Sequence, residues 1–179
     1  MDIVYFDLET QRTFNDVGGS HRKADMRMSV GVTYSSIEGK YQIFSESRVH
    51  ELVDRLRRAS LVVGYNVLDF DYAVLMGYTA LSLPDFLPTL DLMVEIEKSV
   101  GYRLKLEDVA RGTLGVGKIA EGLDAIRWFR EGRFLEIAEY CCYDVKVTKL
   151  IHEFGVAHKA VYFIDRTGRK RSVEVDWRI

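Results

Sequence analysis

Apolar residues recur along the chain with two different spacings, and together these spacings predict an α/β domain. The stretch DIVYFDLET, residues 2–10, is apolar on both faces, so a central strand of a sheet is expected there. Further strands are expected over residues 28–36, 40–45 and 61–66. The polar residues 11–28 contain a Gly-Gly pair and predict a long loop.

Helical spacing dominates the rest of the chain. Helices are expected after the cap residue Ser47 and over residues 69–77, 104–115, 125–132 and 134–154. A connection between Pro84 and Pro88 ends in TLDLM, and residues 160–179 predict a hairpin that turns near Gly168. We therefore expect one domain over residues 1–157, with a C-terminal β-hairpin extension over residues 158–179 packed on it.

Composition indicates an ordinary soluble globular protein of 179 residues, large enough for one domain with a real core. The net charge is −2, from 25 Lys and Arg against 27 Asp and Glu, which gives no bulk electrostatic case for nucleic acid but does not exclude a local basic surface. Cys141 and Cys142 are adjacent on a predicted helix, so we expect a packing and a surface residue and no disulfide. With no signal-peptide pattern and no membrane-length apolar stretch, a cytoplasmic location is expected.

One carboxylate interrupts the apolar face of the 134–154 helix. The apolar stripe of this helix contains Ile137, Cys141, Val145, Thr148 and Ile151. Asp144 falls inside the stripe, and Tyr140 lies one turn before it on the same side. Because a buried, unpaired carboxylate is costly, Asp144 needs either a strong partner or a chemical role.

Three more acids raise the same question. Asp7 and Glu9 are two residues apart in the first strand, so both project from one face near the end of that strand. Taken alone, this pair is better explained as a strand end that faces water. Asp71 lies on an apolar helix face, where an acidic first-turn residue that interacts with the helix dipole is the alternative; Asn66 and Asp69 are alternative cap residues.

Considered together, the four acids predict a metal site. Four neighbouring carboxylates repel one another and cannot all stay ionised without compensation. Divalent cations that prefer oxygen ligands, Mg²⁺ or Mn²⁺, would supply it. Two such ions about 3.5–4 Å apart can activate a water and stabilise the leaving oxygen of a phosphodiester. Tyr140 could then present its hydroxyl to the attacking water.

Three motifs occur in order along the chain: FDLET, GYNVLDFD and YCCYD. The ordered set resembles the three motifs of the DEDD (DnaQ-like) superfamily of 3′-5′ exonucleases. The third motif resembles the tyrosine branch, because the histidine branch has His where Glu139 stands. LKLEDVARGTLGVGK also resembles a segment that many members carry before the third motif. The likeness spans roughly residues 2–154 and is greatest to prokaryotic predicted ribonuclease-H-like exonuclease domains.

The resemblance implies an RNase H-like mixed β-sheet flanked by helices, to which this chain adds the C-terminal β-hairpin, whose role is open. By resemblance, two divalent metal ions, Mg²⁺ or Mn²⁺, are held by Asp7, Glu9, Asp71 and Asp144. Tyr140 would orient the nucleophilic water. The terminal nucleotide would lie against Leu8, Thr10, Asn66 and Phe70. The implied partners are 3′ ends of single-stranded DNA or RNA and, for some members, a helicase or another nucleic-acid-processing protein.

Basic segments offer further candidates for substrate contact. Around the hairpin turn, residues 166–171 contain four basic side chains, where a solvated turn is favoured over phosphate contacts. The basic residues of the 11–28 loop are favoured as a substrate-contacting segment, because long loops in compact domains are often functional. RWFREGRF, residues 127–134, has the composition of a single-strand binder, although core aromatics with surface arginines are more usual. Lys118 is either a site residue or an exposed loop lysine.

The leading hypothesis is a metal-dependent 3′-5′ exonuclease that hydrolyses single-stranded DNA or RNA by a two-metal-ion mechanism. One alternative is a catalytically weak nucleic-acid-binding or recruitment module on the same fold, serving a helicase. The other is a structural protein whose acids are paired by Arg or Lys. The last alternative predicts no thermal stabilisation on adding Mn²⁺.

Overall fold

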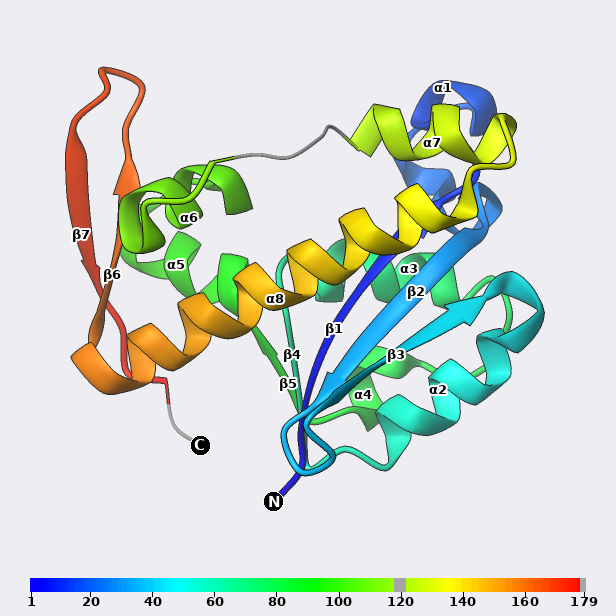
Figure 1. Cartoon of the computed structure of the whole chain (residues 1–179), viewed down its shortest axis with the longest axis horizontal. Coiled ribbons are helices and arrows are strands. Elements are labelled where there is room, and N and C mark those ends of the chain that lie inside the picture. Colours follow the sequence, from blue (N-terminus) through cyan, green and yellow to red (C-terminus); the bar gives the residue numbers. More distant parts are fainter. Residues whose placement is uncertain (118–121, 178–179) are drawn as a thin grey trace.

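A mixed five-stranded sheet forms the centre of the computed structural model, which describes residues 1–117 and 122–177 (Figure 1). The strands are β1 (Ile3–Thr10), β2 (Met28–Ser35), β3 (Lys40–Ser45), β4 (Leu61–Gly64) and β5 (Thr89–Asp91). Their order is β3-β2-β1-β4-β5, with β1 antiparallel to β2 and parallel to β4. The central position of β1 explains why its sequence is apolar on both faces.

Helices cover both faces of this sheet (Figure 1). One face carries α5 (Leu92–Val100), α6 (Leu106–Leu114), α7 (Gly122–Arg130) and α8 (Phe134–His158). The other carries α1 (Phe14–Val17), η1 (Ser20–Met26), α2 (Val49–Arg57), η3 (Val67–Asp71), α3 (Tyr72–Leu75) and α4 (Leu83–Phe86), with the single turn η2 (Glu46–Arg48) before α2. Across residues 1–117 and 122–177, no helix combines the length and apolar character that a bilayer crossing requires.

Alternation along β1 decides which residues meet α8. Ile3 and Tyr5 belong to the core on the α8 side, whereas Phe6 and Leu8 belong to the core on the α2 side. Because side chains of a strand alternate between its two faces, the α8 face continues from Tyr5 to residues 7 and 9. The apolar core of this face therefore gives way to carboxylates at the C-terminal end of the strand.

The C-terminal residues form an antiparallel hairpin of β6 (Ala160–Ile164) and β7 (Lys170–Glu174) that packs against α6 and α8. At Gly112 of α6, an added Cβ would lie 2.4 Å from the Cα of Phe163, so the absence of a side chain permits close packing. The hydroxyl of Thr113 donates to the carbonyl of Tyr162 at 2.7 Å. The fold class predicted from the sequence, a mixed sheet flanked by helices with a C-terminal hairpin, is confirmed.

A buried histidine joins the hairpin extension to the sheet. His152 of α8 is fully buried, shares a 2.9 Å hydrogen bond between its Nδ1 and the Tyr5 hydroxyl, and stacks on Trp177. Burial lowers the pKa of His152 to about 4, so the ring is neutral at pH 7. Val173, Val175 and Trp177 alternate inward along this extension and are buried, and Ile179 lies outside the described residues.

Three segments differ from the sequence prediction. The expected 11–28 loop contains α1 and η1, because Thr13 and Asp16 form a capping box and Gly18 ends the first helix in a left-handed conformation. The connection after Pro88 contains β5 and α5, which were not predicted. Before Tyr72, the expected helix is replaced by the π-helical turn η3, which follows Asn66 in the left-handed region.

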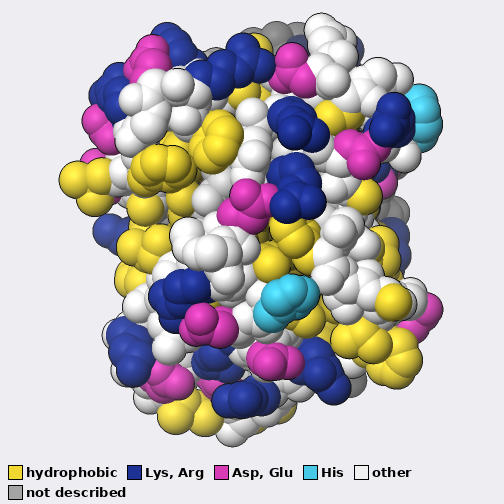
Figure 2. All heavy atoms as spheres, turned by 90° about the vertical axis from the view of Figure 1, so that its right-hand side faces the viewer, with side chains coloured by type: hydrophobic (Ala, Val, Ile, Leu, Met, Phe, Trp, Pro, Cys, Tyr) yellow, Lys and Arg dark blue, Asp and Glu magenta, His cyan; other side chains and the backbone are white. Residues whose placement is uncertain are grey.

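Charge on the side of the molecule at the right of Figure 1 is mixed. Lys and Arg side chains are interspersed there with Asp and Glu (Figure 2). On α2, for example, Arg57 pairs with Asp54, both largely exposed. This face therefore offers no extended basic surface, in agreement with the net charge of −2.

Candidate metal centre

Three of the four predicted acids converge where β1 ends against α8. Asp7 and Glu9 come from the α8 face of β1, and Asp144 comes from the N-terminal half of α8. One carboxylate oxygen from each residue lies within 4.8 Å of the others, and all three side chains are partly buried. The ladder between β1 and β2 shifts register just after Glu9, an irregularity that is common beside functional sites.

The fourth acid, Asp71, stands beside this group. Asp71 is 3% exposed at the end of η3, and its Oδ1 accepts the backbone N–H of Leu8 at 3.0 Å. It is not one of the three residues grouped within 4.8 Å, but its charge raises the pKa of both Asp7 and Glu9. Its hydrogen bond therefore ties the second motif to the strand that carries the first.

Burial and mutual repulsion both disfavour the ionised forms of the acids in the site. Burial raises the pKa values of Asp7 and Glu9 well above their usual range, and repulsion from Asp71 and Asp144 raises them further. Burial also raises the pKa of Asp71 well above its usual value. Within the described part of the chain, no Lys or Arg lies within ion-pair distance of Asp7, Glu9 or Asp71.

The chemistry of this donor set fits divalent cations. The converging atoms are all carboxylate oxygens, the ligands that Mg²⁺ and Mn²⁺ prefer. Bound cations would remove the repulsion that raises the pKa values of Asp7 and Glu9. For these acids, the lack of pairing with Lys or Arg also argues against the alternative of a structural protein with neutralised carboxylates.

Tyr140 lies beside the acids, one turn before Asp144. Burial raises the pKa of Tyr140 above its usual value, as do the nearby carboxylates and a hydrogen bond between its hydroxyl and Asp144. The phenol is thus a proton donor at neutral pH. The ring meets Trp128 of α7 edge to face, with ring centroids 6.3 Å apart, so packing holds it in place.

Cys141 does more than the packing expected of it. Its thiol is fully buried and lies 3.2 Å from the Asp7 Oδ2 and 3.4 Å from the Asp7 carbonyl oxygen. A thiol at this position donates to the Asp7 carboxylate and orients it. Cys142 is partly buried and, like Cys141, a free thiol, so the expectation of no disulfide is confirmed.

Asp91, at the end of β5, is a buried acid that sequence reasoning did not single out. It is 2% exposed, and its carboxylate accepts the backbone N–H groups of Asn66, Leu68 and Met93 at 2.8, 3.0 and 3.1 Å. Asp91 thus caps α5 and fixes the turn that leads to Asp71. The sequence TLDLM did contain a signal for this role: an acidic residue just before the first apolar residue of a helix is typical of an N-cap.

The predicted nucleotide-contacting residues fall into two groups. Leu8 and Thr10 are 3% and 4% exposed, and Leu8 belongs to the core on the α2 side of the sheet. This burial argues against a contact between the Leu8 side chain and a nucleotide. Asn66 and Phe70 are partly buried; Phe70 meets Phe14 edge to face at 5.9 Å, and the Oδ1 of Asn66 is buried without a hydrogen-bond partner.

Basic side chains near the first motif are mostly engaged by acids. Arg22, Lys23 and Arg27 of the 11–28 segment form ion pairs of 2.6, 2.7 and 2.6 Å. In residues 127–134, Trp128 and Phe129 pack on the core while the arginines lie at the surface, so the more usual interpretation of that segment holds. Lys118 lies outside the described residues.

Metal binding should stabilise the native state, and more so as pH rises. We expect Mn²⁺ at about 100 times its dissociation constant to raise the melting temperature by about 5–10 °C near pH 8. The metal-free native state retains protons on Asp7 and Glu9 that unfolded carboxylates have lost, so its unfolding free energy falls as pH rises through their raised pKa values. Because the metal must displace these protons, its stabilising effect grows over the same range.

Differential scanning fluorimetry with and without Mn²⁺ at several pH values measures this effect. Asp144→Asn should reduce the shift, whereas Asp54→Asn should retain it, because Asp54 is an exposed acid of α2. An identical melting temperature with and without metal across the pH range would contradict a metal centre here.

Comparisons with known proteins agree with the fold. The family model of the RNase_H superfamily matches residues 4–156. The structure resembles that of the family B DNA polymerase from the hyperthermophilic archaeon Pyrobaculum calidifontis, with a TM-score of 0.67 and 17% sequence identity over 87% of this chain and 24% of the polymerase. The chain thus spans about a quarter of the polymerase, and the likeness is one of fold. The search of curated proteins gave no match. The chain has the expected RNase H-like fold and belongs to the RNase_H superfamily.

Proposed function

We propose that this protein is a metal-dependent 3′-5′ exonuclease of the tyrosine branch of the DEDD superfamily, acting on single-stranded DNA or RNA. The observation that carries the proposal is the convergence of Asp7, Glu9 and Asp144 within 4.8 Å at the end of the central strand. The RNase_H superfamily match supports a nuclease, and the ordered motifs support the exonuclease class.

The acids of this chain act as ligands in the proposal. Asp7, Glu9, Asp71 and Asp144 would hold two divalent cations, Mg²⁺ or Mn²⁺. Bound there, the cations would supply activation of the attacking water and stabilisation of the departing 3′ oxygen. Cys141 holds the Asp7 carboxylate in one orientation through its thiol. The Leu8 N–H does the same for Asp71.

Tyr140 would position the water for in-line attack. Its hydroxyl forms a hydrogen bond with Asp144, so a water near that carboxylate would contact the hydroxyl. Its raised pKa keeps the proton on the phenol, which makes it an orienting group and not a general base. Of the four residues proposed for the terminal nucleotide, Asn66 and Phe70 are the least buried.

Degradation of labelled single strands tests the function. With Mg²⁺ or Mn²⁺, a 5′-labelled oligonucleotide should give a ladder of progressively shorter products, whereas a 3′-labelled one should release labelled mononucleotide from the start. A phosphorothioate at the terminal linkage should slow the first step, and EDTA should stop the reaction. Parallel DNA and RNA substrates decide which nucleic acid is preferred.

Two outcomes would redirect the assignment. Cleavage of circular single-stranded DNA at a comparable rate would indicate an endonuclease, because a circle has no 3′ end. Tight binding of oligonucleotides without metal-stimulated cleavage would support the recruitment-module alternative.

A further inference from the structure

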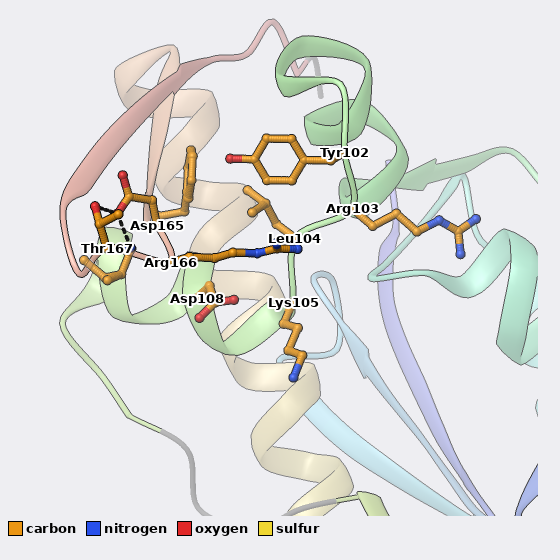
Figure 3. A pocket seen from close by; sticks show the side chains of 10 residues that line it. Tyr102, Arg103, Leu104, Lys105, Asp108, Asp165, Arg166 and Thr167 are labelled. Carbon is orange, nitrogen blue, oxygen red and sulfur yellow. Dashed lines mark hydrogen bonds between the residues drawn. The ribbon is translucent and has the colours of Figure 1, made fainter.

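A cavity of about 560 Å³ lies between the segment that precedes α6 and the turn of the C-terminal hairpin (Figure 3). Tyr102, Arg103 and Lys105 line it from the first segment, and Phe163 and Arg166 line it from the hairpin. None of these residues belongs to the proposed metal site. The hairpin, which has no counterpart in the motifs of the domain, thus forms one wall of a groove.

Both walls of this groove are held by specific contacts. At the hairpin turn, the Asp165 carboxylate accepts the hydroxyl of Thr167 at 2.6 Å and the backbone N–H of Arg169 at 3.0 Å. Tyr102 of the opposite wall meets Phe163 of the hairpin edge to face, with ring centroids 6.4 Å apart. In the same wall as Tyr102, the Leu104 carbonyl accepts a hydrogen bond from the Tyr65 hydroxyl at 2.8 Å. The groove is therefore formed in the free protein and needs little ordering when a ligand binds.

Two cations of the groove are available to a ligand. Arg103 is engaged by Asp69 and Glu97 at 3.3 and 3.4 Å. Lys105 and Arg166 are exposed, and no carboxylate of the described residues lies within 4.0 Å of either side-chain nitrogen group. Figure 3 shows Arg166 reaching from the hairpin across the cavity toward Leu104. This contrasts with the 11–28 segment, where Arg22, Lys23 and Arg27 are all paired.

The groove lies next to the acidic site. Lys105 and Asp108, at the first turn of α6, line the larger cavity. Leu106, on the same turn, lines a smaller cavity of about 170 Å³ together with Tyr140 and Asp144. Residues at the start of α6 therefore line both the groove and the cavity beside the acids.

We propose that the groove between residues 102–105 and the hairpin turn binds single-stranded nucleic acid upstream of the scissile bond. Lys105 and Arg166 would contact backbone phosphates, which supply most of the affinity for such a strand. Tyr102, which is 48% exposed, offers a ring on which a base can stack. This inference deepens the proposed exonuclease function and rests on it for the direction of the strand.

Equilibrium binding tests the groove separately from catalysis. Fluorescence anisotropy of a labelled oligonucleotide is measured in EDTA, where no cleavage occurs. We expect Lys105→Gln with Arg166→Gln to weaken binding about 10-fold and to reduce the slope of log affinity against log salt by about 1.4, the value for two phosphate contacts. Asp108→Asn, which removes a carboxylate from the groove wall, should have the opposite effect and tighten binding.

A matched control places the same change elsewhere. Lys40→Gln with Arg57→Gln removes two exposed cations from the far side of the sheet and should leave the affinity unchanged. Tyr102→Ala should weaken binding about 10-fold, and Tyr102→Phe should restore it, because stacking needs the ring and not the hydroxyl.

Activity then locates the groove relative to the metal site. The para-nitrophenyl ester of thymidine 5′-monophosphate is too short to extend beyond the acids, so the Lys105→Gln, Arg166→Gln variant should hydrolyse it at the wild-type rate. For an oligonucleotide the same variant should show a raised KM with little change in kcat.

These experiments distinguish a wrong groove assignment from a wrong exonuclease assignment. Wild-type cleavage with an unchanged oligonucleotide KM in the double variant would overturn the groove alone. Groove-dependent binding without any cleavage would overturn the function and retain the groove. Equally tight binding of a polyglutamate chain that also depends on Lys105 and Arg166 would indicate an acidic protein ligand and overturn the assignment to nucleic acid.

Discussion

Replacing Asp7 with asparagine is expected to lower the rate of phosphodiester hydrolysis by about 1000-fold or more, because a lost ligand removes several kcal/mol of transition-state stabilisation. Asp7 is one of the three acids that converge at the site. Its carboxylate lies within 4.8 Å of Glu9 and Asp144 and receives the Cys141 thiol. Asparagine keeps the shape and one acceptor oxygen, so the loss is one of charge and metal affinity rather than of packing.

The same substitution should make the metal-free protein more stable. Repulsion and burial raise the pKa of Asp7, which means that its ionised form is disfavoured in the native state. Asparagine cannot ionise, so the native state no longer bears the cost of protonating residue 7 or of repulsion between it, Glu9 and Asp144. The melting temperature near neutral pH should therefore rise by a few degrees, while the gain from Mn²⁺ is lost. A site under functional strain typically shows such opposite changes in stability and activity.

Single-turnover cleavage and thermal unfolding of the same preparations measure both effects. Asp54→Asn is the matched control, because it removes an exposed carboxylate that is paired with Arg57 on the opposite side of the sheet. An Asp7→Asn protein that degrades oligonucleotides at the wild-type rate would remove Asp7 from the site. A lower melting temperature without metal would show that Asp7 stabilises the fold instead of straining it.

Periodicity in the sequence, considered together with the ordered motifs, predicted the acidic cluster. The period of two along β1 puts Asp7 and Glu9 on one face, and helical spacing puts Asp144 on the inner face of α8. Both are local signals carried by long, strongly patterned elements. Their convergence followed because β1 is the central strand and α8 packs across it.

The parts that the sequence did not reveal depend on contacts between distant residues. Asp91 holds Asn66 from 25 positions away along the chain, and no local pattern shows that these residues meet. The short helix α1 owes its place to a capping box and to an ion pair between Asp16 and Arg130, which lies 114 residues further on. Short elements of this kind are stabilised by tertiary contacts more than by propensity.

The backbone conformation around Asp71 is a second feature that the local sequence pattern did not predict. Its position in the second motif predicted a role, but helical spacing predicted an ordinary helix from residue 69. The backbone instead forms a π-helical turn that brings the carboxylate to the Leu8 N–H. Turns of this type are frequent at functional sites, since they redirect one side chain without breaking the helix that follows.

Replacing Tyr140 with phenylalanine is expected to lower kcat by about 100-fold with little change in KM, because poor positioning of a reacting group can cost about that factor. The substitution removes the hydroxyl that bonds Asp144 and keeps the ring that packs on Trp128. Stability should therefore change little. The shape of the pH–rate profile should also be unchanged, because the raised pKa of Tyr140 keeps it protonated throughout the range in which the acids titrate.

Steady-state kinetics across pH, with thermal unfolding of each variant, separates this role from two others. If Tyr140 were a general base, the wild-type rate would rise with pH as the phenol loses its proton, and Tyr140→Phe would remove that rise. If it served only packing, Tyr140→Phe would match the wild type in kcat. Tyr41→Phe controls for the loss of a phenolic hydroxyl, because Tyr41 lies on the edge strand β3 with its ring against Tyr34 and is not one of the residues of the acidic site. A kcat that falls for Tyr140→Phe alone, with an unaltered profile, would fit a hydroxyl that orients water beside Asp144.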